Sequence, residues 1–189
     1  MADLPSPFRR WAFLDRDGTI IPDKVYLSNP ADVEFAPGAV EGLRLLRDAG
    51  FGFVMITNQS GIGRGYFTND DFVAVQARLT ALLAAEGLVL AATYHCPHAP
   101  SDDCACRKPR PGMLRAAMTR FGIAPDHVVM IGDSDADIGA ARAAGIAGIR
   151  IRQGAAKGAT KSEAEGEAEG TVSDFRTAAR LAAVMLSAT

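Results

Sequence analysis

The sequence predicts an α/β fold, in which a doubly wound (Rossmann-like) parallel sheet is covered by helices on both faces. Strand-like apolar runs alternate with helical patterns along the 189 residues, and glycines mark many of the joints. Runs such as FGFVMIT at 51–57 are almost continuously apolar, which is typical of strands buried on both faces. We expect one domain over residues 1–189, because this length is about one domain's worth.

Strands are predicted where short apolar runs lie between turn signals. The first run, WAFL, carries a strand to about residue 15, and FGFVMIT and HVVMIG are runs of the same kind. In chain order, the predicted strands cover about 11–15, 51–57, 89–94, 127–132 and 146–151.

Helices are predicted between these strands. Val40, Leu43 and Leu46 recur at helical spacing in the first, and a second begins with the capping box Thr68-x-x-Asp71. In chain order, the predicted helices cover about 38–49, 69–86, 111–121, 135–144 and 174–187. Four of them are followed by a glycine that can take a positive φ, at Gly50, Gly87, Gly122 and Gly145.

The segment 154–171, GAAKGATKSEAEGEAEGT, contains no large apolar residue. Such a composition cannot bury a core face, so we expect a flexible surface loop before the last helix rather than a helical interaction segment.

Composition excludes some classes of function. The net charge of −2 and the lack of a polybasic run argue against a general nucleic-acid or membrane-surface binder. No uninterrupted apolar stretch reaches the ~20 residues of a membrane span, and no signal-peptide pattern follows Arg9 and Arg10. We therefore expect a cytoplasmic protein, acting as a monomer on a small molecule.

Two carboxylates, Asp15 and Asp17, follow the first predicted strand. In an extended chain, side chains two residues apart point to the same side, where these two would repel each other. This arrangement predicts a cation between them, and Mg²⁺ suits oxygen ligands.

Other polar residues lie where further strands end, and ligands of an open parallel sheet bind beyond the carboxyl ends of its strands. We expect one site there, built from carboxylates, a hydroxyl, a glycine-containing turn and a lysine, which suits Mg²⁺ together with a phosphate. Besides the two aspartates, its candidate residues are Thr57, Asn58, Gln59, Ser60, Arg107, Lys108, Arg110 and Asp133.

All three cysteines lie in the spacing Cys96-x-His98-x5-Cys104-x-Cys106. Four such ligands would form a closed tetrahedral Zn²⁺ site, which leaves no position for water and is therefore structural. His95 is a rival ligand to His98. A redox-active cysteine set is the alternative function, although no C-x-x-C spacing is present.

The motifs DRDGTI, TNQSGIGRGY, CRKPRPGM and GDSDAD occur in an order that resembles the haloacid dehalogenase superfamily of aspartate-nucleophile phosphatases. The resemblance spans residues 12–151. The finer pattern is similar to two groups within it, the heptose bisphosphate phosphatases and the histidinol-phosphate phosphatases.

The resemblance implies a role for each matching residue. Asp15 would be the nucleophile and Asp17 the general acid and base, while Asp15, Asp133 and the carbonyl of Asp17 would hold Mg²⁺, with Asp137 behind them. Lys108 would serve the phosphoryl group that is transferred. Thr57 and the backbone amides of Asn58–Ser60 would hold its oxygens. The family pattern also favours His98 over His95 as the zinc ligand, and hydrogen bonding or exposure is then expected for His95.

Specificity is expected from short loops, because too few residues separate Asp17 from Thr57 for a large cap domain. These loops are the flap at 23–27, the segment 61–66 and the zinc loop. Arg64, Arg107 and Arg110 could hold a second anionic group, although a plain surface charge explains Arg64 and Arg110 equally well. Asp102 and Asp103 could instead suit the amine of histidinol phosphate. The motifs favour the sugar bisphosphate, through TNQSGIGRGY and RPGM, whereas the short zinc loop favours histidinol phosphate.

Three other interpretations stay open at this point. Each motif alone could be a helix cap or a surface turn with no chemical role. This interpretation is disfavoured for all the motifs together, because they would have to occur at adjacent strand ends by chance. A non-catalytic, zinc-containing interaction module would keep the motifs without hydrolysis. A phosphotransferase such as a mutase is less favoured, because without a cap the aspartyl-phosphate is open to water.

Overall fold

Seven strands form one sheet in the structure, a computed structural model that describes residues 8–152, 160–161 and 169–187. The strands are Arg10–Leu14 (β1), Phe51–Asn58 (β2), Leu90–Cys96 (β3), Val128–Gly132 (β4), Ala147–Ile151 (β5), Thr160–Lys161 (β6) and Glu169–Val172 (β7). Their order is β3-β2-β1-β4-β5-β7-β6, and only the β6–β7 pair is antiparallel.

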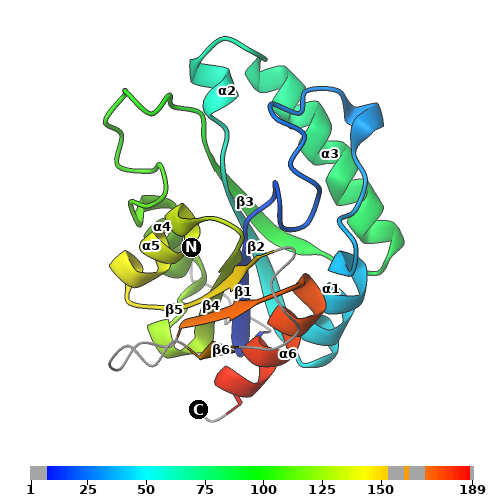
Figure 1. Cartoon of the computed structure of the whole chain (residues 1–189), viewed down its shortest axis with the longest axis vertical. Helices are drawn as coiled ribbons and strands as arrows, with labels where there is room; N and C mark the ends of the chain where they lie inside the picture. Colours follow the sequence, from blue (N-terminus) through cyan, green and yellow to red (C-terminus); the bar gives the residue numbers. More distant parts are fainter. Residues whose placement is uncertain (1–7, 153–159, 162–168, 188–189) are drawn as a thin grey trace.

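Helices cover both faces of this sheet. They are Ala39–Asp48 (α1), Ser60–Gly63 (α2), Asn69–Ala85 (α3), Gly112–Phe121 (α4), Asp135–Ala144 (α5) and Phe175–Met185 (α6), with short 3-10 turns at Pro30–Asp32 (η1) and Pro125–His127 (η2). α1, α3 and α6 lie on one side of the sheet, and α4 and α5 lie on the other (Figure 1). The predicted doubly wound fold is therefore confirmed.

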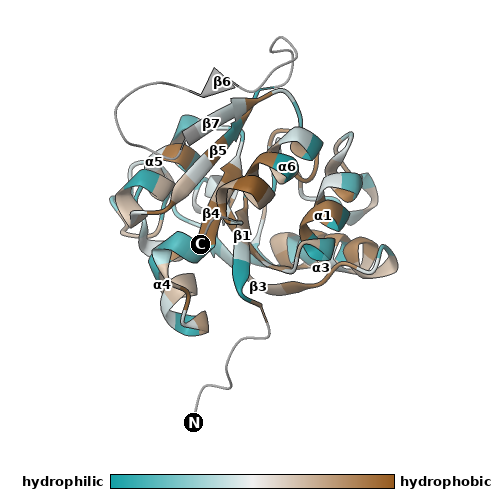
Figure 2. Cartoon of the chain, turned by 90° about the horizontal axis from the view of Figure 1, so that it is seen from below, coloured by the Kyte–Doolittle hydropathy of each residue, from teal (hydrophilic) through white to brown (hydrophobic). Residues whose placement is uncertain are grey.

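Alternate residues of the central strands supply the two halves of the core. In β1, Trp11 and Phe13 pack in a cluster with Met113 of α4, whereas Leu14 packs in a cluster with Leu43 of α1. Because both faces are covered, both sets of side chains must be apolar, which explains the continuous apolar runs. Figure 2 shows these hydrophobic strands between the two helix layers.

Local signals placed the helix ends well. Thr68 caps α3 in a complete capping box with Asp71, as predicted. The four glycines that follow predicted helices all take a positive φ, between 62° and 82°. Glycine adopts this left-handed conformation more easily than other residues do, so the helices end at the expected positions.

The chain winds outward from β1 in both directions, and the switch point lies between β1 and β4. A crevice beyond the carboxyl ends of the strands is expected at such a point. The segment after β1, α2 and the loop 97–111 all gather at this end of the sheet (Figure 1).

The expectation of a flexible loop over 154–171 is wrong at two places. Residues 160–161 form β6, and β7 begins at residue 169 and pairs with β5. Backbone pairing, rather than an apolar pattern, builds this edge, and Gly170 suits it because a Cβ there would lie 2.5 Å from Leu181 of α6. The rest of the segment, 154–159 and 162–168, lies outside the described residues.

Over the described part of the chain, the helices are all too short or too polar to cross a membrane.

Candidate active site

Lys108 lies at the centre of a buried cluster at the carboxyl ends of β1 and β2. Its side chain is 3% exposed, and its Nζ donates to Asp15 Oδ1 at 2.7 Å, Asp137 Oδ1 at 2.5 Å and the carbonyl oxygen of Ile56 at 2.7 Å. All three ammonium protons therefore have acceptors. Residues from β1, β2, the loop before α4 and the start of α5 meet at this one nitrogen.

The charges of this cluster do not balance. Oxygens of Asp15, Asp133 and Asp137 lie within 4.8 Å of one another, and among the described residues Lys108 is the cation that forms ion pairs with these carboxylates. Burial raises the pKa of Asp15 to about 8, against the opposing effect of Lys108. Burial and the Asp137 carboxylate raise the pKa of Asp133 to about 6. Burial alone would lower the pKa of Lys108, but Asp15 and Asp137 raise it.

This imbalance fits a divalent cation. When all three carboxylates are ionised, one lysine leaves two negative charges uncompensated, and the raised pKa values of Asp15 and Asp133 mean that burial disfavours this ionised state without a further cation. Oxygen ligands are those that Mg²⁺ prefers. Asp133 also packs against the backbone that follows Asp17, because a Cβ on Gly18 would lie 2.1 Å from Asp133 Oδ2. Gly18 has a φ of +77°, so glycine is favoured there on both grounds. The donor set of the described residues thus consists of the three carboxylates, with the backbone at Gly18 packed against Asp133.

Asp137 lies behind the other two carboxylates. It is fully buried, its Oδ1 accepts from Lys108, and its Oδ2 accepts from the backbone N–H and hydroxyl of Ser134. Ser134 and Asp137 form the capping box of α5. Both carboxylate oxygens therefore already have protein donors.

The extended chain expected over Asp15 and Asp17 is not observed, although the two carboxylates stay close enough for Asp17 to raise the pKa of Asp15. β1 ends at Leu14, and the chain then turns, with the N–H of Ile20 donating to the Arg16 carbonyl at 2.9 Å. Asp17 consequently turns to different partners. Its carboxylate accepts from Arg16 Nε at 3.1 Å, and from Gln59 Nε2 at 2.8 Å. Each aspartate thus has a cation of its own, Lys108 or Arg16.

The TNQS segment serves the site differently from the prediction. Asn58 exchanges hydrogen bonds with the backbone of Lys108, at 3.0 and 3.1 Å, so its side chain fixes the lysine loop. The N–H of Gln59, which was expected to hold phosphate, donates to the Cys96 carbonyl at 2.8 Å. Thr57 is buried, and its hydroxyl accepts from Gln59 at 2.8 Å, which leaves the hydroxyl proton to donate. Ser60 lines the nearby cavity.

Two cavities flank Lys108 and Asp17. One, of about 290 Å³, is lined by Asp17, by the flap residues Asp23 and Tyr26, and by the segment 58–61. The other, of about 480 Å³, lies between the loop residues 99–104 and 107–110. The flap and the zinc loop therefore line these cavities, whereas Gly61 is the residue of the segment 61–66 that does so.

The three candidate arginines differ in their surroundings. Arg107 lines the larger cavity, and its buried Nη1 has no hydrogen-bond partner among the described residues. Arg110 lines the same cavity but pairs with Asp103 and the Cys104 carbonyl. Arg64 is exposed at the end of α2, outside both of these cavities.

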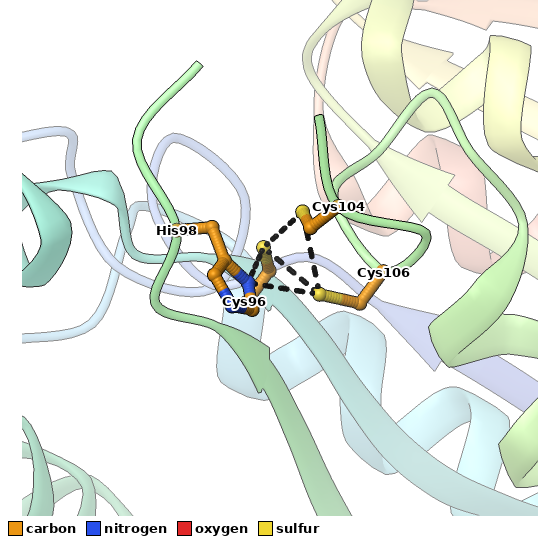
Figure 3. Close-up of side chains that lie close together, drawn as sticks. All are labelled: Cys96, His98, Cys104 and Cys106. Carbon is orange, nitrogen blue, oxygen red and sulfur yellow. Dashed lines mark hydrogen bonds between the residues drawn. The ribbon is translucent and has the colours of Figure 1, made fainter. Parts of the chain in front are cut away.

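The four predicted zinc ligands converge (Figure 3). His98 Nδ1 lies 3.3 Å from Cys106 Sγ and 3.5 Å from Cys96 Sγ, and the sulfurs lie 3.2–3.5 Å apart. A tetrahedral Zn²⁺ with bonds of ~2.0–2.3 Å needs its ligands about 3.4–3.8 Å apart. The ligand atoms are thus close to the spacing of a closed site.

The rival interpretations of this cluster find no support in the geometry. His95 stacks on Phe72, with ring centroids 4.1 Å apart, instead of joining the cysteines. Stacking was not expected for His95, because the sequence does not reveal that Phe72 lies beside it. All three cysteines are free, and their sulfur distances far exceed the ~2.05 Å of a disulfide.

Arg16 and Ser134 were not among the residues predicted for the site. Arg16 is 1% exposed and donates two hydrogen bonds to Asp17. It was missed because arginine side chains are usually exposed to solvent. Ser134 could have been found, because Ser134-x-x-Asp137 is itself a capping-box pattern.

Comparison with known proteins agrees with this geometry. The HAD-hydrolase-like family model matches residues 105–178. The D-glycero-β-D-manno-heptose-1,7-bisphosphate 7-phosphatase of Pasteurella multocida is 40% identical over 140 residues, which cover 71% of this chain and 76% of that protein. The enzyme of the same name from Helicobacter pylori is 43% identical over 127 residues, covering 67% and 73%.

Solved structures agree as well. The D,D-heptose 1,7-bisphosphate phosphatase from B. bronchiseptica, complexed with magnesium and phosphate, has a TM-score of 0.80 and 33% identity, and the match covers 95% of this chain and 99% of that one. The phosphatase of the same name from Burkholderia thailandensis has a TM-score of 0.64 and 26% identity, covering 90% and 96%.

HAD phosphatases use Mg²⁺, which matches the uncompensated carboxylates beside Lys108. The relatives are named as phosphatases of a sugar bisphosphate, which supports a small phosphate ester as the partner of this chain. The chain therefore belongs to the HAD-like hydrolases, as a phosphatase that hydrolyses phosphoric monoesters.

Proposed function

We propose that the chain removes the 7-phosphate of D-glycero-D-manno-heptose 1,7-bisphosphate, a precursor step of the ADP-heptose and lipopolysaccharide core pathway, through an aspartyl-phosphate. The relatives named above carry this activity in their names. The observation that carries the assignment to a substrate with two phosphates is the unpartnered Nη1 of Arg107, one residue from the central Lys108.

In the first step, an oxygen of Asp15 attacks phosphorus, and the bond from phosphorus to the sugar oxygen breaks. Asp17 gives a proton to that leaving oxygen. In the second step, water attacks the aspartyl-phosphate, Asp17 takes the proton of the water, and the carboxylate of Asp15 is restored. Lys108 offsets the repulsion between the Asp15 carboxylate and the phosphate dianion, and the Thr57 hydroxyl can donate to a phosphoryl oxygen.

Asp15, Asp133 and the carbonyl of Asp17 would hold Mg²⁺, with Asp137 orienting Lys108 behind them. When bound, the cation supplies positive charge against the phosphoryl oxygens. The backbone nest expected over Asn58–Ser60 is reduced by the hydrogen bond from the Gln59 N–H to Cys96, so the side chains carry more of this duty.

Histidinol phosphate fits the loops less well. The carboxylates that were expected to suit its amine already have partners, because Asp103 pairs with Arg110 and Asp102 Oδ2 accepts from the N–H of Ala99 at 2.7 Å. Arg107 would moreover repel an amine. These contacts favour a second anionic group on the substrate. We infer that Arg110 shapes the 480 Å³ cavity, whereas Arg64, which lies outside both cavities, is a surface charge.

Arg107→Ala is expected to lower kcat/KM for the heptose bisphosphate by about 10- to 150-fold. A charge-assisted arginine–phosphate contact contributes ~1.5–3 kcal/mol, and each 1.4 kcal/mol is about a factor of ten. For p-nitrophenyl phosphate, which has no second phosphate, the change should be small. For histidinol phosphate, turnover should be unchanged or improved. The measurement is phosphate release with all three substrates.

Arg120→Ala is a matched control, because Arg120 is exposed on the last turn of α4, where it stacks on Phe121. It should leave all three rates unchanged. An equal loss with every substrate in Arg107→Ala would contradict the role given to this arginine.

We propose that Zn²⁺ binds Cys96, His98, Cys104 and Cys106 and fixes the loop that carries Arg107 and Lys108. The Cys96 carbonyl accepts from Gln59, and Cys106 directly precedes Arg107, so the cluster connects to both sides of the active site. Its role is positional, since four protein ligands leave no open position.

Cys104→Ser, or removal of zinc by a chelator, is expected to lower the melting temperature and kcat together. Structural zinc contributes directly to folding, and the loop loses its anchor without it. The assay is run with saturating Mg²⁺, so that chelation of Mg²⁺ does not explain the loss. Metal analysis that finds no zinc, with unchanged melting and turnover after chelation, would sink this proposal.

We infer that the protein acts in the cytoplasm as a monomer; both statements stay predictions from the sequence.

A further inference from the structure

Arg16 is a buried cation that the proposed chemistry does not use directly. Its side chain is 1% exposed, yet it lines the 290 Å³ cavity together with Asp17. The guanidinium lies over the ring of Phe72, 5.4 Å from the centroid, and its Nη1 is buried without a hydrogen-bond partner among the described residues. Burial of a charged guanidinium costs free energy of folding unless the group is paired and hydrogen-bonded.

Two of the hydrogen bonds of Arg16 go directly to Asp17. Arg16 Nε donates to Asp17 Oδ2 at 3.1 Å, and Arg16 Nη2 donates to Asp17 Oδ1 at 3.2 Å, so the pair is bidentate. A bidentate arginine fixes both the position and the plane of a carboxylate.

Gln59 completes the arrangement. Its Oε1 accepts from Arg16 Nη2 at 2.9 Å, while its Nε2 donates to Asp17 Oδ2 and to Thr57 Oγ1, both at 2.8 Å. Gln59 is 4% exposed, so solvent has little access to the hydrogen bonds that it forms with Arg16, Asp17 and Thr57. Asp17 itself keeps a quarter of its side chain exposed (25%), on the cavity side.

We propose that Arg16, together with Gln59, is a positioning residue that fixes the Asp17 side chain, so that its carboxyl group, once protonated, lies where it can give its proton to the leaving oxygen. This inference rests on the proposed function, in which Asp17 transfers that proton. Arg16 does not touch the phosphate, so its whole effect on the reaction passes through Asp17.

A role in proton transfer can be separated from a role in folding by the leaving group. An alkyl phosphate has a poor leaving group, which needs the proton, whereas 2,4-dinitrophenolate leaves without one. The ratio of kcat/KM for glycerol 2-phosphate to that for 2,4-dinitrophenyl phosphate therefore reports on protonation by Asp17. Loss of folded enzyme lowers both values and leaves the ratio unchanged.

The test is Arg16→Met, which removes the bidentate donors and keeps much of the apolar stem. We expect kcat/KM to fall about 100-fold for glycerol 2-phosphate and less than about threefold for 2,4-dinitrophenyl phosphate. Arg16→Lys keeps the positive charge but lacks the planar guanidinium, so its kcat/KM for glycerol 2-phosphate should be intermediate between those of wild type and Arg16→Met. Gln59→Met should lower the ratio of the two kcat/KM values in the same way but by a smaller factor. This variant replaces Arg16→Met in the test if Arg16→Met does not fold.

A double-mutant cycle with Asp17→Asn is the second measurement. Because Arg16 acts through Asp17, Arg16→Met should change the alkyl-ester kcat/KM less than about twofold when added to Asp17→Asn. Equal losses with both esters, or additive losses in the cycle, would overturn the inference. Neither ester is a sugar bisphosphate, so a wrong substrate assignment would leave this result intact.

Discussion

Asp15→Asn is expected to lower kcat by at least about 10⁴-fold and to abolish the aspartyl-phosphate, because an amide cannot supply the attacking carboxylate oxygen. Asp15 is also the residue that Lys108 contacts from across the site, at 2.7 Å. The change is measured by steady-state phosphate release and by acid-quench trapping of labelled phosphoenzyme.

Asp17→Asn is the paired variant, because Asp17 has different partners and a different proposed role. It should impair both steps, while its backbone carbonyl stays available to Mg²⁺. Calorimetric measurement of Mg²⁺ binding, together with the melting temperature, shows whether each variant is folded. Activity above about one per cent of wild type in folded Asp15→Asn would remove the covalent mechanism.

Lys108→Met is expected to reduce kcat about 10²- to 10³-fold with every substrate, since the lost charge serves the phosphoryl group being transferred. It should also destabilise the Mg²⁺-free protein by about 3–5 kcal/mol, because Asp15 and Asp137 lose their buried counter-ion. Mg²⁺ should restore part of this stability. Urea denaturation with and without Mg²⁺, together with kinetics, measures both effects.

Lys24→Met is the stability control for this variant. Lys24 forms an exposed ion pair with Glu34 at 2.7 Å, and exposed pairs contribute less than about 1 kcal/mol. If Lys108→Met were no more destabilising than Lys24→Met, the buried charge cluster would not have the importance given to it here.

Most of the fold could be predicted from the sequence, because the apolar pattern and the helix-ending glycines were strong local signals. The continuous runs of β1, β2 and β4 follow from two buried faces, and each strand was placed within two residues. α2 was missed, since four residues are too few to show periodicity. β7 was missed because it is held by its backbone partner β5 and by the fit of Gly170 under α6.

The membership of the site could also be predicted, but its internal contacts could not. Parallel strands bring their carboxyl ends together, so Asp15, Thr57 and Asp133 had to meet at one edge. The sequence does not show that the chain turns after Leu14, and this turn sends Asp17 to Arg16. Likewise, nothing in the motif TNQS indicates that the side chain of Asn58 binds the backbone of Lys108.

Hydrolysis of the 7-phosphate of a heptose bisphosphate can be followed by phosphorus NMR of the wild-type reaction. With Mg²⁺ and D-glycero-D-manno-heptose 1,7-bisphosphate, the account predicts inorganic phosphate and heptose 1-phosphate, at a kcat/KM at least about tenfold above that for histidinol phosphate. Preference for histidinol phosphate, or release of the 1-phosphate, would contradict it.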